Sequence, residues 1–282
     1  MTATTYVTTS PLVDTEWVAQ HLSDEGVRLF EVDVDTSAYG TGHIQGAVGL
    51  DWRQDLQQRP VRDIITKEQL ERLLSLHGVT PKTTIVAYGD NNNWFAAWFF
   101  WLLSYYGHPE LRLMDGGRAK WIAEGRPLTT DPPEHAPATY RAPALRKELR
   151  ALRDEVLAAI GKPGSALVDV RSPREYSGEL LAPENLPQEG AQRGGHIPAA
   201  QNVPWSQAVR EDGTFKPTDE LRSLYAGKGI TPEKETIAYC RIGERSAHTW
   251  FVLTQLLGHP KVRNYDGSWT EWGSMIGVPV ER

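Results

Sequence analysis

The chain has 282 residues, of which 40% are hydrophobic, so it can bury a sizeable core and has room for about two domains. A formal net charge of −6 excludes a general affinity for nucleic acid or acidic membrane surfaces, and a single cysteine excludes internal disulfides and paired-cysteine metal sites. The first residues lack the basic and apolar regions of a signal peptide, and no apolar run approaches the roughly 18 residues of a membrane span. We therefore expect a soluble, cytoplasmic protein with neither a membrane nor a nucleic-acid partner.

The two halves of the sequence repeat each other. Residues 84–121 align with residues 236–272, apart from the first position, and share a Gly-His-Pro turn, an Asp-Gly pair and a final tryptophan. An earlier block, residues 29–52, resembles residues 166–205, where the second copy carries an insertion. Each copy is far longer than the roughly 20 to 50 residues of a stacking repeat, which indicates two domains rather than a solenoid.

The connection between the copies lies in a proline-rich stretch in which neither helical nor strand periodicity holds. We predict a first domain over residues 1–128, a linker over residues 129–146 and a second domain over residues 147–282.

Each copy alternates short apolar runs with longer helical patterns. Examples are ALVDV at residues 166–170 and TIAYC at residues 236–240, with TDELRSLYAGKG at residues 218–229 between them. This alternation predicts an α/β fold of two tandem domains, each a mostly parallel sheet with helices on both faces.

The single cysteine, Cys240, stands where a predicted strand gives way to a helix. A polar stretch that contains Gly243 follows it, and apolar residues recur at helical spacing from Ser246 onward. In an open α/β sheet this edge binds ligands, and a helix N-terminus presents free N–H groups to anions. With Arg241 and Arg245 close by, we expect an anion site beside a nucleophile whose pKa is lowered.

The first copy supplies an internal control. Gly89 takes the place of Cys240, and Asp90 takes the place of Arg241. A loop without a nucleophile, and with an acid that repels anions, predicts that the first domain is catalytically silent.

With these features the sequence resembles the two-domain rhodaneses, the thiosulfate sulfurtransferases. The resemblance rests on YCRIGERSAHTW, YDGSWTEW, VDVRSPREYSGE and GGHIPAAQNVPW, and it covers nearly the whole chain. It implies that the Cys240 thiolate takes a sulfane sulfur from thiosulfate, holds it as a persulfide and passes it to cyanide or a thiol. It implies no metal and no organic cofactor.

The resemblance also implies the substrate-binding residues. The arginines would grip the donor's oxyanion while the loop backbone cradles the persulfide, which assigns binding roles to Arg241, Ile242, Gly243, Glu244, Arg245 and Ser246.

Comparison of the two copies adds residues outside the loop. Asp169 matches Asp33 at a strand end, which indicates support of the loop by hydrogen bonding, and Trp269 replaces Arg118, which makes it a candidate lining of the donor pocket. His43 and its match His196 occupy turns, and we expect them to be structural rather than catalytic.

The donor is less firmly indicated. The related 3-mercaptopyruvate enzymes carry C-G-S/A-G loops, so the arginine after Cys240 favours thiosulfate. However, the vertebrate thiosulfate enzymes place a substrate arginine just before an aromatic residue, where this chain has Glu175, with Arg174 one place earlier. Arg193 resembles an arginine that mercaptopyruvate enzymes use to hold a carboxylate, so activity on either donor remains open.

Two other functions share this kind of loop. A dual-specificity phosphatase would need the spacing C-x5-R, whereas Arg245 gives C-x4-R, and a docking module would not need the cysteine and both arginines. The expected partners are therefore a small sulfur donor and a thiophilic acceptor such as cyanide, a dithiol or thioredoxin.

Overall fold

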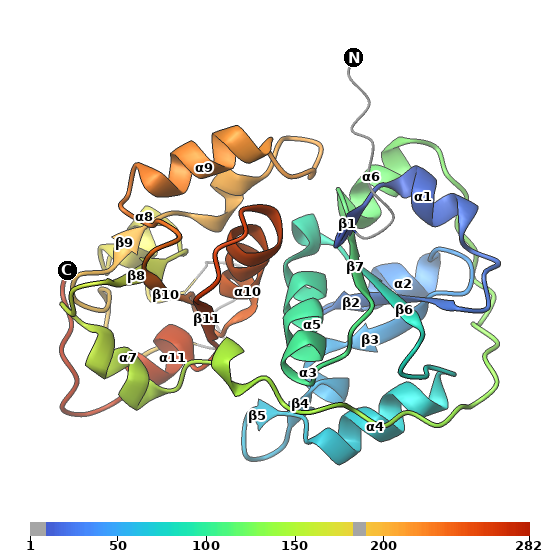
Figure 1. Cartoon of the computed structure of the whole chain (residues 1–282), viewed down its shortest axis with the longest axis horizontal. Coiled ribbons are helices and arrows are strands. Elements are labelled where there is room, and N and C mark those ends of the chain that lie inside the picture. The colour runs from blue at the N-terminus through green and yellow to red at the C-terminus, as the bar shows by residue number, and fades with distance from the viewer. Residues whose placement is uncertain (1–9, 183–189) are drawn as a thin grey trace. The chain divides into compact units, whose positions relative to one another are not determined.

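The computed structural model describes residues 10–182 and 190–282, which form two compact units. The first unit runs to Arg146 and includes residues 211–214, and the second comprises residues 147–210 and 215–282. Each unit contains its own parallel sheet (Figure 1). The limits predicted for the domains stay a prediction, and residues 129–146 belong to the first unit.

The first unit is built around a five-stranded sheet in the order β1-β7-β6-β2-β3, in which every neighbouring pair is parallel. Its strands are β1 (Leu12–Val13), β2 (Val27–Asp33), β3 (Val48–Asp51), β6 (Thr84–Tyr88) and β7 (Leu111–Met114). A small antiparallel pair stands apart, formed by β4 (Gln57–Gln58) and β5 (Asp63–Ile64). The helices are α1 (Thr15–Gln20), α2 (Ser37–Thr41), α3 (Trp52–Asp55), α4 (Lys67–Leu76), the 3-10 turn η1 (Asn91–Asn93), α5 (Trp94–Tyr105) and α6 (Gly117–Ala123).

Helices cover both faces of this sheet. On one face α1 and α6 bury Val18 and Trp121 against alternate strand residues such as Val86. On the other face α5 lies along the strands, and its Phe99 ring packs 5.4 Å from Phe30 of β2. Because α5 is almost entirely buried, its aromatic side chains form the core rather than a binding surface.

The second unit repeats the plan with the sheet order β11-β10-β8-β9, again wholly parallel. Its strands are β8 (Ser165–Asp169), β9 (Gln201–Asn202), β10 (Glu235–Tyr239) and β11 (Val262–Tyr265). Its helices are η2 (Lys147–Leu149), α7 (Arg153–Ala159), α8 (Pro173–Tyr176), η3 (Trp205–Ala208), α9 (Thr218–Ala226), α10 (Glu244–Phe251) with its π-helical extension η4 (Val252–Leu256), and α11 (Ser268–Trp272).

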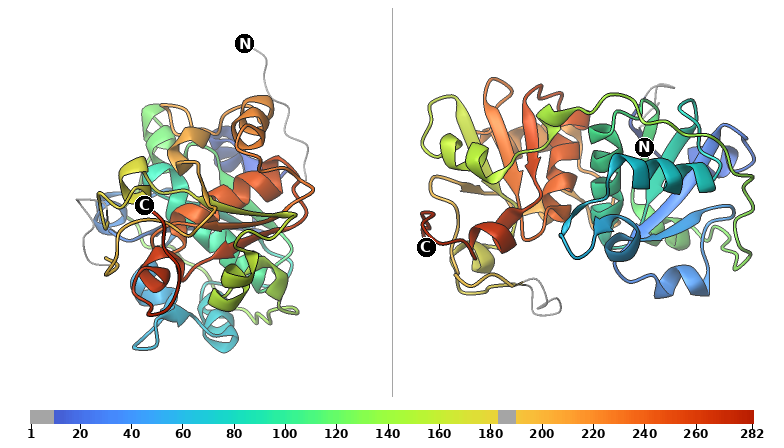
Figure 2. Two further views of the ribbon diagram at one scale, coloured as in Figure 1. Left: turned by 90° about the vertical axis from the view of Figure 1, so that its left-hand side faces the viewer. Right: turned by 90° about the horizontal axis from the view of Figure 1, so that it is seen from below.

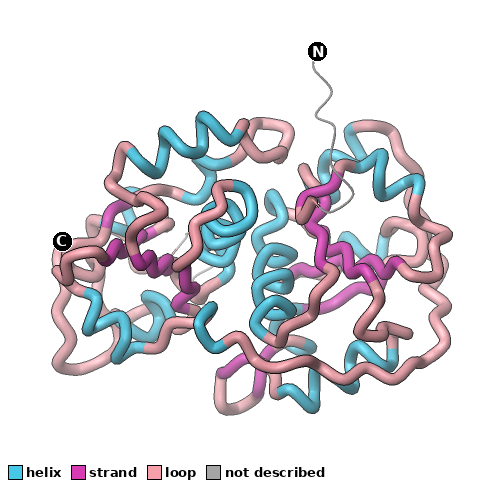
Figure 3. Tube along the Cα trace, viewed as in Figure 1, coloured by secondary structure: helices cyan, strands magenta, loops and turns pink. Residues whose placement is uncertain are grey.

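Helices again cover both faces of the second sheet. Val156 of α7 and Trp272 of α11 pack on the face that carries Leu167 and Ile237, and α10 covers the opposite face. Figures 2 and 3 show strands enclosed by helices within each unit. The α/β architecture expected from the alternating pattern is therefore confirmed. No helix among the described residues is both long and apolar enough to cross a bilayer.

The two copies share their internal hydrogen bonds as well as their order of elements. The hydroxyl of Tyr88, at the end of β6, accepts from the Ile44 N–H at 3.2 Å, and Tyr239 does the same for Ile197 at 3.0 Å. These bonds tie the last residues of β6 and β10 to the turns that precede β3 and β9.

The paired histidines are structural, as predicted. His43 stacks on Tyr39 at 4.0 Å, and His196 stacks on Tyr176 at 3.6 Å. In each case Nδ1 contacts the carbonyl oxygen of the same tyrosine, so the ring closes the turn on itself.

The two copies use arginines from different elements to bind the equivalent backbone carbonyl. In the first unit Arg118 of α6 donates to Glu31 at 2.9 Å and to the carbonyl of Gly42. In the second unit Arg171, just after β8, donates to Asp169 and reaches the matching carbonyl of Gly195 at 2.7 Å. Each copy therefore holds the carbonyl before its histidine with an arginine from a different element.

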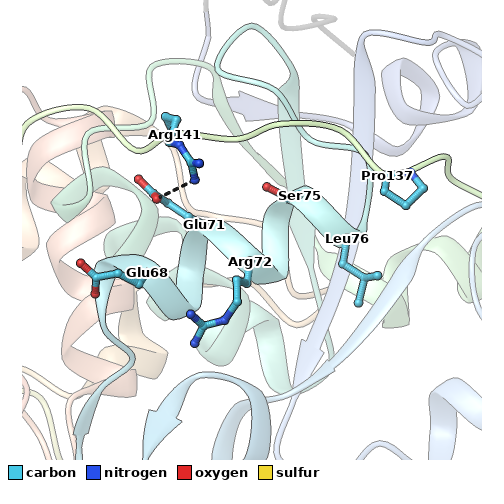
Figure 4. A pocket seen from close by; sticks show the side chains of 7 residues that line it. All are labelled: Glu68, Glu71, Arg72, Ser75, Leu76, Pro137 and Arg141. Carbon is cyan, nitrogen blue, oxygen red and sulfur yellow. Dashed lines mark hydrogen bonds and ion pairs between the residues drawn. The ribbon is translucent and has the colours of Figure 1, made fainter.

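The connection after α6 is tied to the first unit. Tyr140 is fully buried and its hydroxyl lies 3.0 Å from His108 Nδ1, while Arg141 pairs with Glu71 of α4 at 3.2 Å. A shallow hollow of about 410 Å³ lies between α4 and this connection (Figure 4), lined by Glu68, Glu71, Arg72, Ser75, Leu76, Pro137 and Arg141. Because Arg141 and Glu71 point toward each other there, the hollow marks an anchoring point of the connection.

Replacement of Arg118 by alanine is expected to lower the free energy of unfolding of the first unit by about 3 kcal/mol, since Glu31 would remain buried without its partner. Urea unfolding followed by tryptophan fluorescence measures the loss. Glu31→Leu combined with Arg118→Met removes both charges and should recover part of it. A double variant no more stable than Arg118→Ala would contradict the importance of the pair.

Candidate active site

Cys240 directly follows β10 and begins the short loop that leads into α10. Gly243 makes this sharp turn possible, because its φ of 100° is a conformation that side chains disfavour. A Cβ at this position would also lie 2.6 Å from the Cα of Asp266. The glycine therefore brings the start of α10 back beneath the cysteine.

The start of α11 fixes the loop backbone from one side. The Cys240 N–H donates to Ser268 Oγ at 3.0 Å, and the N–H groups of Trp269 and Thr270 donate to the carbonyls of Cys240 and Arg241, both at 3.0 Å. These three hydrogen bonds hold the backbone of Cys240 and Arg241. The position of the thiol therefore depends on α11, whose first residue is 28 positions further along the chain.

A second set of bonds fixes the loop from β11. Asn264 is buried in that strand, and its Nδ2 donates to the carbonyl of Gly243 at 3.0 Å. Its Oδ1 accepts from Ser246 Oγ at 2.6 Å. Ser246, expected to contact the donor, thus braces the first turn of α10.

The thiol of Cys240 has no exposed surface, and Gly243 and Glu244 both contact it. The Gly243 N–H donates to Sγ at 3.1 Å, and Sγ lies 3.3 Å from Glu244 Oε2, to which the thiol donates. One bond favours a negative sulfur, while the other needs the proton to stay on sulfur. The site can therefore hold the cysteine in either protonation state.

The expectation of a lowered cysteine pKa is wrong for this resting state. Burial raises the pKa of Cys240 above its ordinary value, and the nearby Glu244 carboxylate raises it further. Arg245 and Ser246 act in the opposite direction without reversing the result. The sequence showed the arginines and the helix N-terminus, but not the depth of burial or the contact with Glu244.

The two loop arginines are buried, and each lies beside a buried carboxylate. Arg245 forms a two-point ion pair with Glu175 of α8, with both N–O distances at 3.0 Å. Arg241 lies 3.9 Å from Glu244. Two positive charges therefore face two negative ones, so the dense positive charge inferred from the loop sequence is largely balanced.

The Arg245–Glu175 pair has a strong electrostatic signature. Burial alone would raise the pKa of Glu175, but the Arg245 guanidinium outweighs it and lowers that pKa to about 2. Glu175 is therefore ionised throughout the neutral range and holds α10 to α8.

Three residues expected at the donor site lie in other settings. Arg174 extends from α8 with half of its side chain exposed and pairs with Glu179 at 2.8 Å. The Arg193 guanidinium donates to four backbone carbonyls, those of Trp272, Gly273, Met275 and Val278. Trp269 is fully buried and its Nε1 donates to the Arg193 carbonyl. Each of the three side chains thus has a bonding partner other than the Cys240 thiol.

Asp169 supports the site through Arg171. Its carboxylate accepts from the Arg171 backbone N–H at 3.0 Å and from the guanidinium, which lies over the Trp269 ring at 4.5 Å. Since Trp269 N–H in turn binds the Cys240 carbonyl, the support reaches the loop by way of α11.

The model of a known family, the rhodanese-like domain, matches residues 14–124 and again residues 152–275. The chain belongs to the rhodanese family. Both halves match, so the first unit is a second rhodanese-like domain that carries Gly89 where the other has Cys240.

Curated relatives cover almost the whole chain. A protein of Saccharopolyspora erythraea named "Putative thiosulfate sulfurtransferase" is 55% identical over 270 residues, which are 96% of this chain and 95% of that protein. The Thermus thermophilus protein named "Sulfur carrier protein TtuD" is 54% identical over 274 residues, 96% of either chain.

Solved structures share the fold of this rhodanese. An anaerobic ergothioneine biosynthesis enzyme from Chlorobium limicola, in complex with trimethyl histidine, matches with a TM-score of 0.84 and 27% identity over 96% of this chain and 70% of that one. A structure of EanB in which ergothioneine is covalently linked with a persulfide cysteine matches with a TM-score of 0.85 and 28% identity over the same shares.

Sequence reasoning missed Glu175 and Arg171 as parts of this rhodanese site. One signal for Glu175 was present: Ser172 to Glu175 has the spacing of a capping box, and Ser172 N–H donates to the Glu175 carboxylate at 3.0 Å. That cap turns Glu175 inward and leaves Arg174 outside. Across the described part of the chain, no group of three or more histidine, cysteine, aspartate or glutamate side chains could hold a metal ion.

Replacement of Glu175 by alanine is expected to lower the free energy of unfolding of the second unit by about 3 to 5 kcal/mol, because Arg245 would stay buried without its partner. Its exposed neighbour on the same helix supplies the control, and Arg174→Ala should change stability by no more than about 0.5 kcal/mol. Urea unfolding compares the two variants. Equal losses would show that the ion pair does not matter.

The same pair predicts an acid-dependent loss of stability. The pKa of Glu175 is lowered from 4.5 to about 2, so its contribution is complete above 4.5 and is lost as the pH falls toward 2. The stability advantage of the wild type over Glu175→Gln should therefore shrink between about pH 5 and about pH 2, as measured by urea unfolding at each pH. An advantage that is constant or grows on acidification would refute this assignment.

Proposed function

We propose that this rhodanese is a thiosulfate sulfurtransferase that carries sulfane sulfur as a persulfide on Cys240. The observation that carries the proposal is the position of the sulfur atom, which lies at the start of α10 and accepts the Gly243 N–H at 3.1 Å. A backbone donor aimed at sulfur stabilises the anionic forms through which the reaction passes. The relative named for thiosulfate supports the choice of donor.

The reaction divides into two half-reactions that share one intermediate. Sγ bonds to the outer sulfur of thiosulfate, and the sulfur–sulfur bond of the donor breaks with its electron pair on the departing sulfite. An acceptor then attacks the outer sulfur of the persulfide, and Sγ leaves with the electron pair. Cyanide becomes thiocyanate in this step, whereas a thiol becomes a persulfide.

The site residues have distinct roles in this proposal. Gly243 N–H holds the sulfur, Arg241 and Arg245 bind the donor's sulfonate, and Ile242, Glu244 and Ser246 complete the loop. Arg174, Arg193 and Trp269 are not assigned a contact with the donor, because their side chains bind elsewhere in the second unit. We keep Asp169 as a support of the loop through Arg171.

3-Mercaptopyruvate is the second candidate donor, and a specific observation favours considering it. Glu175 and Glu244 balance the loop arginines, which weakens the preference for a dianion that the loop sequence indicates. A donor with one carboxylate and a thiol suits such a balanced site at least as well. A direct comparison of the two donors decides between them.

The acceptor, the compartment and the domain limits are also proposals. Cyanide, a dithiol or thioredoxin could take the sulfur, and the relative named as a sulfur carrier is compatible with a protein acceptor. We propose a cytoplasmic location, where a single reduced thiol is maintained. We also propose residues 1–128 as a silent domain and residues 129–146 as its connection to a catalytic domain, residues 147–282.

Incubation with thiosulfate should increase the intact mass of the protein by one sulfur atom, and cyanide should remove it. Mass spectrometry of the whole protein measures both steps, and 3-mercaptopyruvate in a parallel sample ranks the donors by loading rate. Cys240→Ser should not load from either donor while keeping its fold by circular dichroism. If the wild type gains no mass, the proposal fails, and hydrolysis of an aryl phosphate would then support a phosphatase.

A further inference from the structure

Glu244 has an unusual position for a residue of an anion-binding loop. Its side chain is fully buried, and its Oε2 lies 3.3 Å from Sγ of Cys240. Its Oε1 accepts no hydrogen bond from any described residue, although the guanidiniums of Arg241 and Arg245 lie within 3.9 Å. A buried carboxylate that is incompletely hydrogen-bonded costs folding free energy, so its retention beside a nucleophile calls for a chemical reason.

Binding of the donor does not provide that reason. A carboxylate repels thiosulfate and its sulfonate, and its charge also disfavours the Cys240 thiolate that must attack. Its one favourable property is its contact with the thiol proton. Because Cys240 has no exposed surface, water has no direct route to that proton in this structure.

We propose that Glu244 is the proton acceptor for Cys240 during sulfur loading. This inference rests on the proposed sulfurtransferase function and deepens it. The S–H bond breaks with its electron pair on Sγ, and the proton moves to Glu244 Oε2. Sγ bonds to the outer sulfur of thiosulfate, sulfite departs with the electron pair of the broken sulfur–sulfur bond, and Glu244 gives the proton to sulfite. Thiol and thiosulfate thus become persulfide anion and hydrogen sulfite, with the carboxylate restored.

The charges around the loop are compatible with transfer of a proton from Cys240 to Glu244. Arg241 and Arg245 lie beside Glu244, and Glu175 of α8 holds Arg245 from the other side. Two further ion pairs lie after neighbouring strands, between Asp169 and Arg171 after β8 and between Asp266 after β11 and Arg150. Transfer from Cys240 to Glu244 leaves the net charge of this buried cluster unchanged, which avoids a large change in solvation energy.

A shared proton predicts a distinctive pH dependence. Because the Glu244 carboxylate contacts Sγ, the thiol can pass its proton within the pair and need not first release it to solvent. Loading of the wild type should therefore be nearly independent of pH in the neutral range. In Glu244→Gln the thiol titrates alone, so loading should fall about tenfold per pH unit below its pKa.

The test measures the rate of sulfur loading from thiosulfate against pH, with samples quenched in acid and weighed as intact protein. Glu244→Gln should fall below the wild type at acid pH and reach or exceed it at alkaline pH, because the repulsion of the thiolate is lost. Glu179→Gln removes an exposed carboxylate of the same unit, the partner of Arg174, and its profile should remain as flat as that of the wild type. If the loading rate of Glu244→Gln depends on pH in the same way as that of the wild type, even at a lower absolute rate, the proposal is overturned.

A second measurement separates this inference from the proposed function. Incorporation of ¹³C-labelled cysteine gives one resonance, since Cys240 is the only cysteine, and its chemical shift reports the thiol without any donor. In Glu244→Gln the titration of the thiol should move to lower pH, because the Glu244 carboxylate raises the pKa of Cys240, whereas Glu244→Asp keeps a carboxylate and should shift it less. If thiosulfate does not load the wild type but the titration of Cys240 moves in Glu244→Gln, the proposed donor is wrong, while the interaction between Glu244 and the thiol is supported. An unchanged titration in Glu244→Gln overturns the pair whatever the donor.

Discussion

The ion pair between Arg245 and Glu175 is the constraint on which the second unit's site depends. It joins the first turn of α10 to α8 with two bonds of 3.0 Å between buried groups. The loop that carries Cys240 leads directly into α10. Its other hydrogen bonds are made with α11 and β11. Without the pair, Arg245 would keep only its contact of 3.6 Å with Glu244 beside the nucleophile, and the two bonds from α10 to α8 would be lost.

The balance of charge gives the site its chemical character. Loops that bind anions usually depend on an excess of positive charge, yet here two arginines meet two glutamates within a protein interior. Such a site attracts an anion less strongly from a distance than the loop sequence indicates. In exchange, the glutamate next to sulfur provides a place for a proton that a purely basic loop lacks. Binding and proton transfer are thus assigned to different residues of one short segment.

Much of this arrangement could be predicted from the sequence, because the chain contains its own comparison. The repeat identified two domains of one fold, and the contrast between Gly89 and Cys240 located the reactive loop. The structural role of the two histidines also followed from their matching turns. These inferences depend on local order and spacing, which sequence displays directly.

The remaining features depend on contacts between distant residues. Glu175 is 70 positions from Arg245, so the sequence does not show that the two residues are partners, and its position beside Tyr176 indicates only that a substrate arginine is missing. Arg193 carries a charge that suggested a ligand, but four carbonyls occupy its guanidinium. The exchange of Arg118 for Arg171 was hidden because the two arginines occupy unrelated positions in the alignment. The pKa of Cys240 was predicted in the wrong direction since burial cannot be read from a polar loop.

The complete burial of Cys240 has a consequence for resistance to oxidation. Peroxides attack thiolates that are exposed, whereas this thiol is covered and its pKa is raised. The chain has no second cysteine with which a sulfenic acid could form a rescuing internal disulfide, so protection has to precede the damage. The protein thus keeps its one thiol in the form that oxidants attack least.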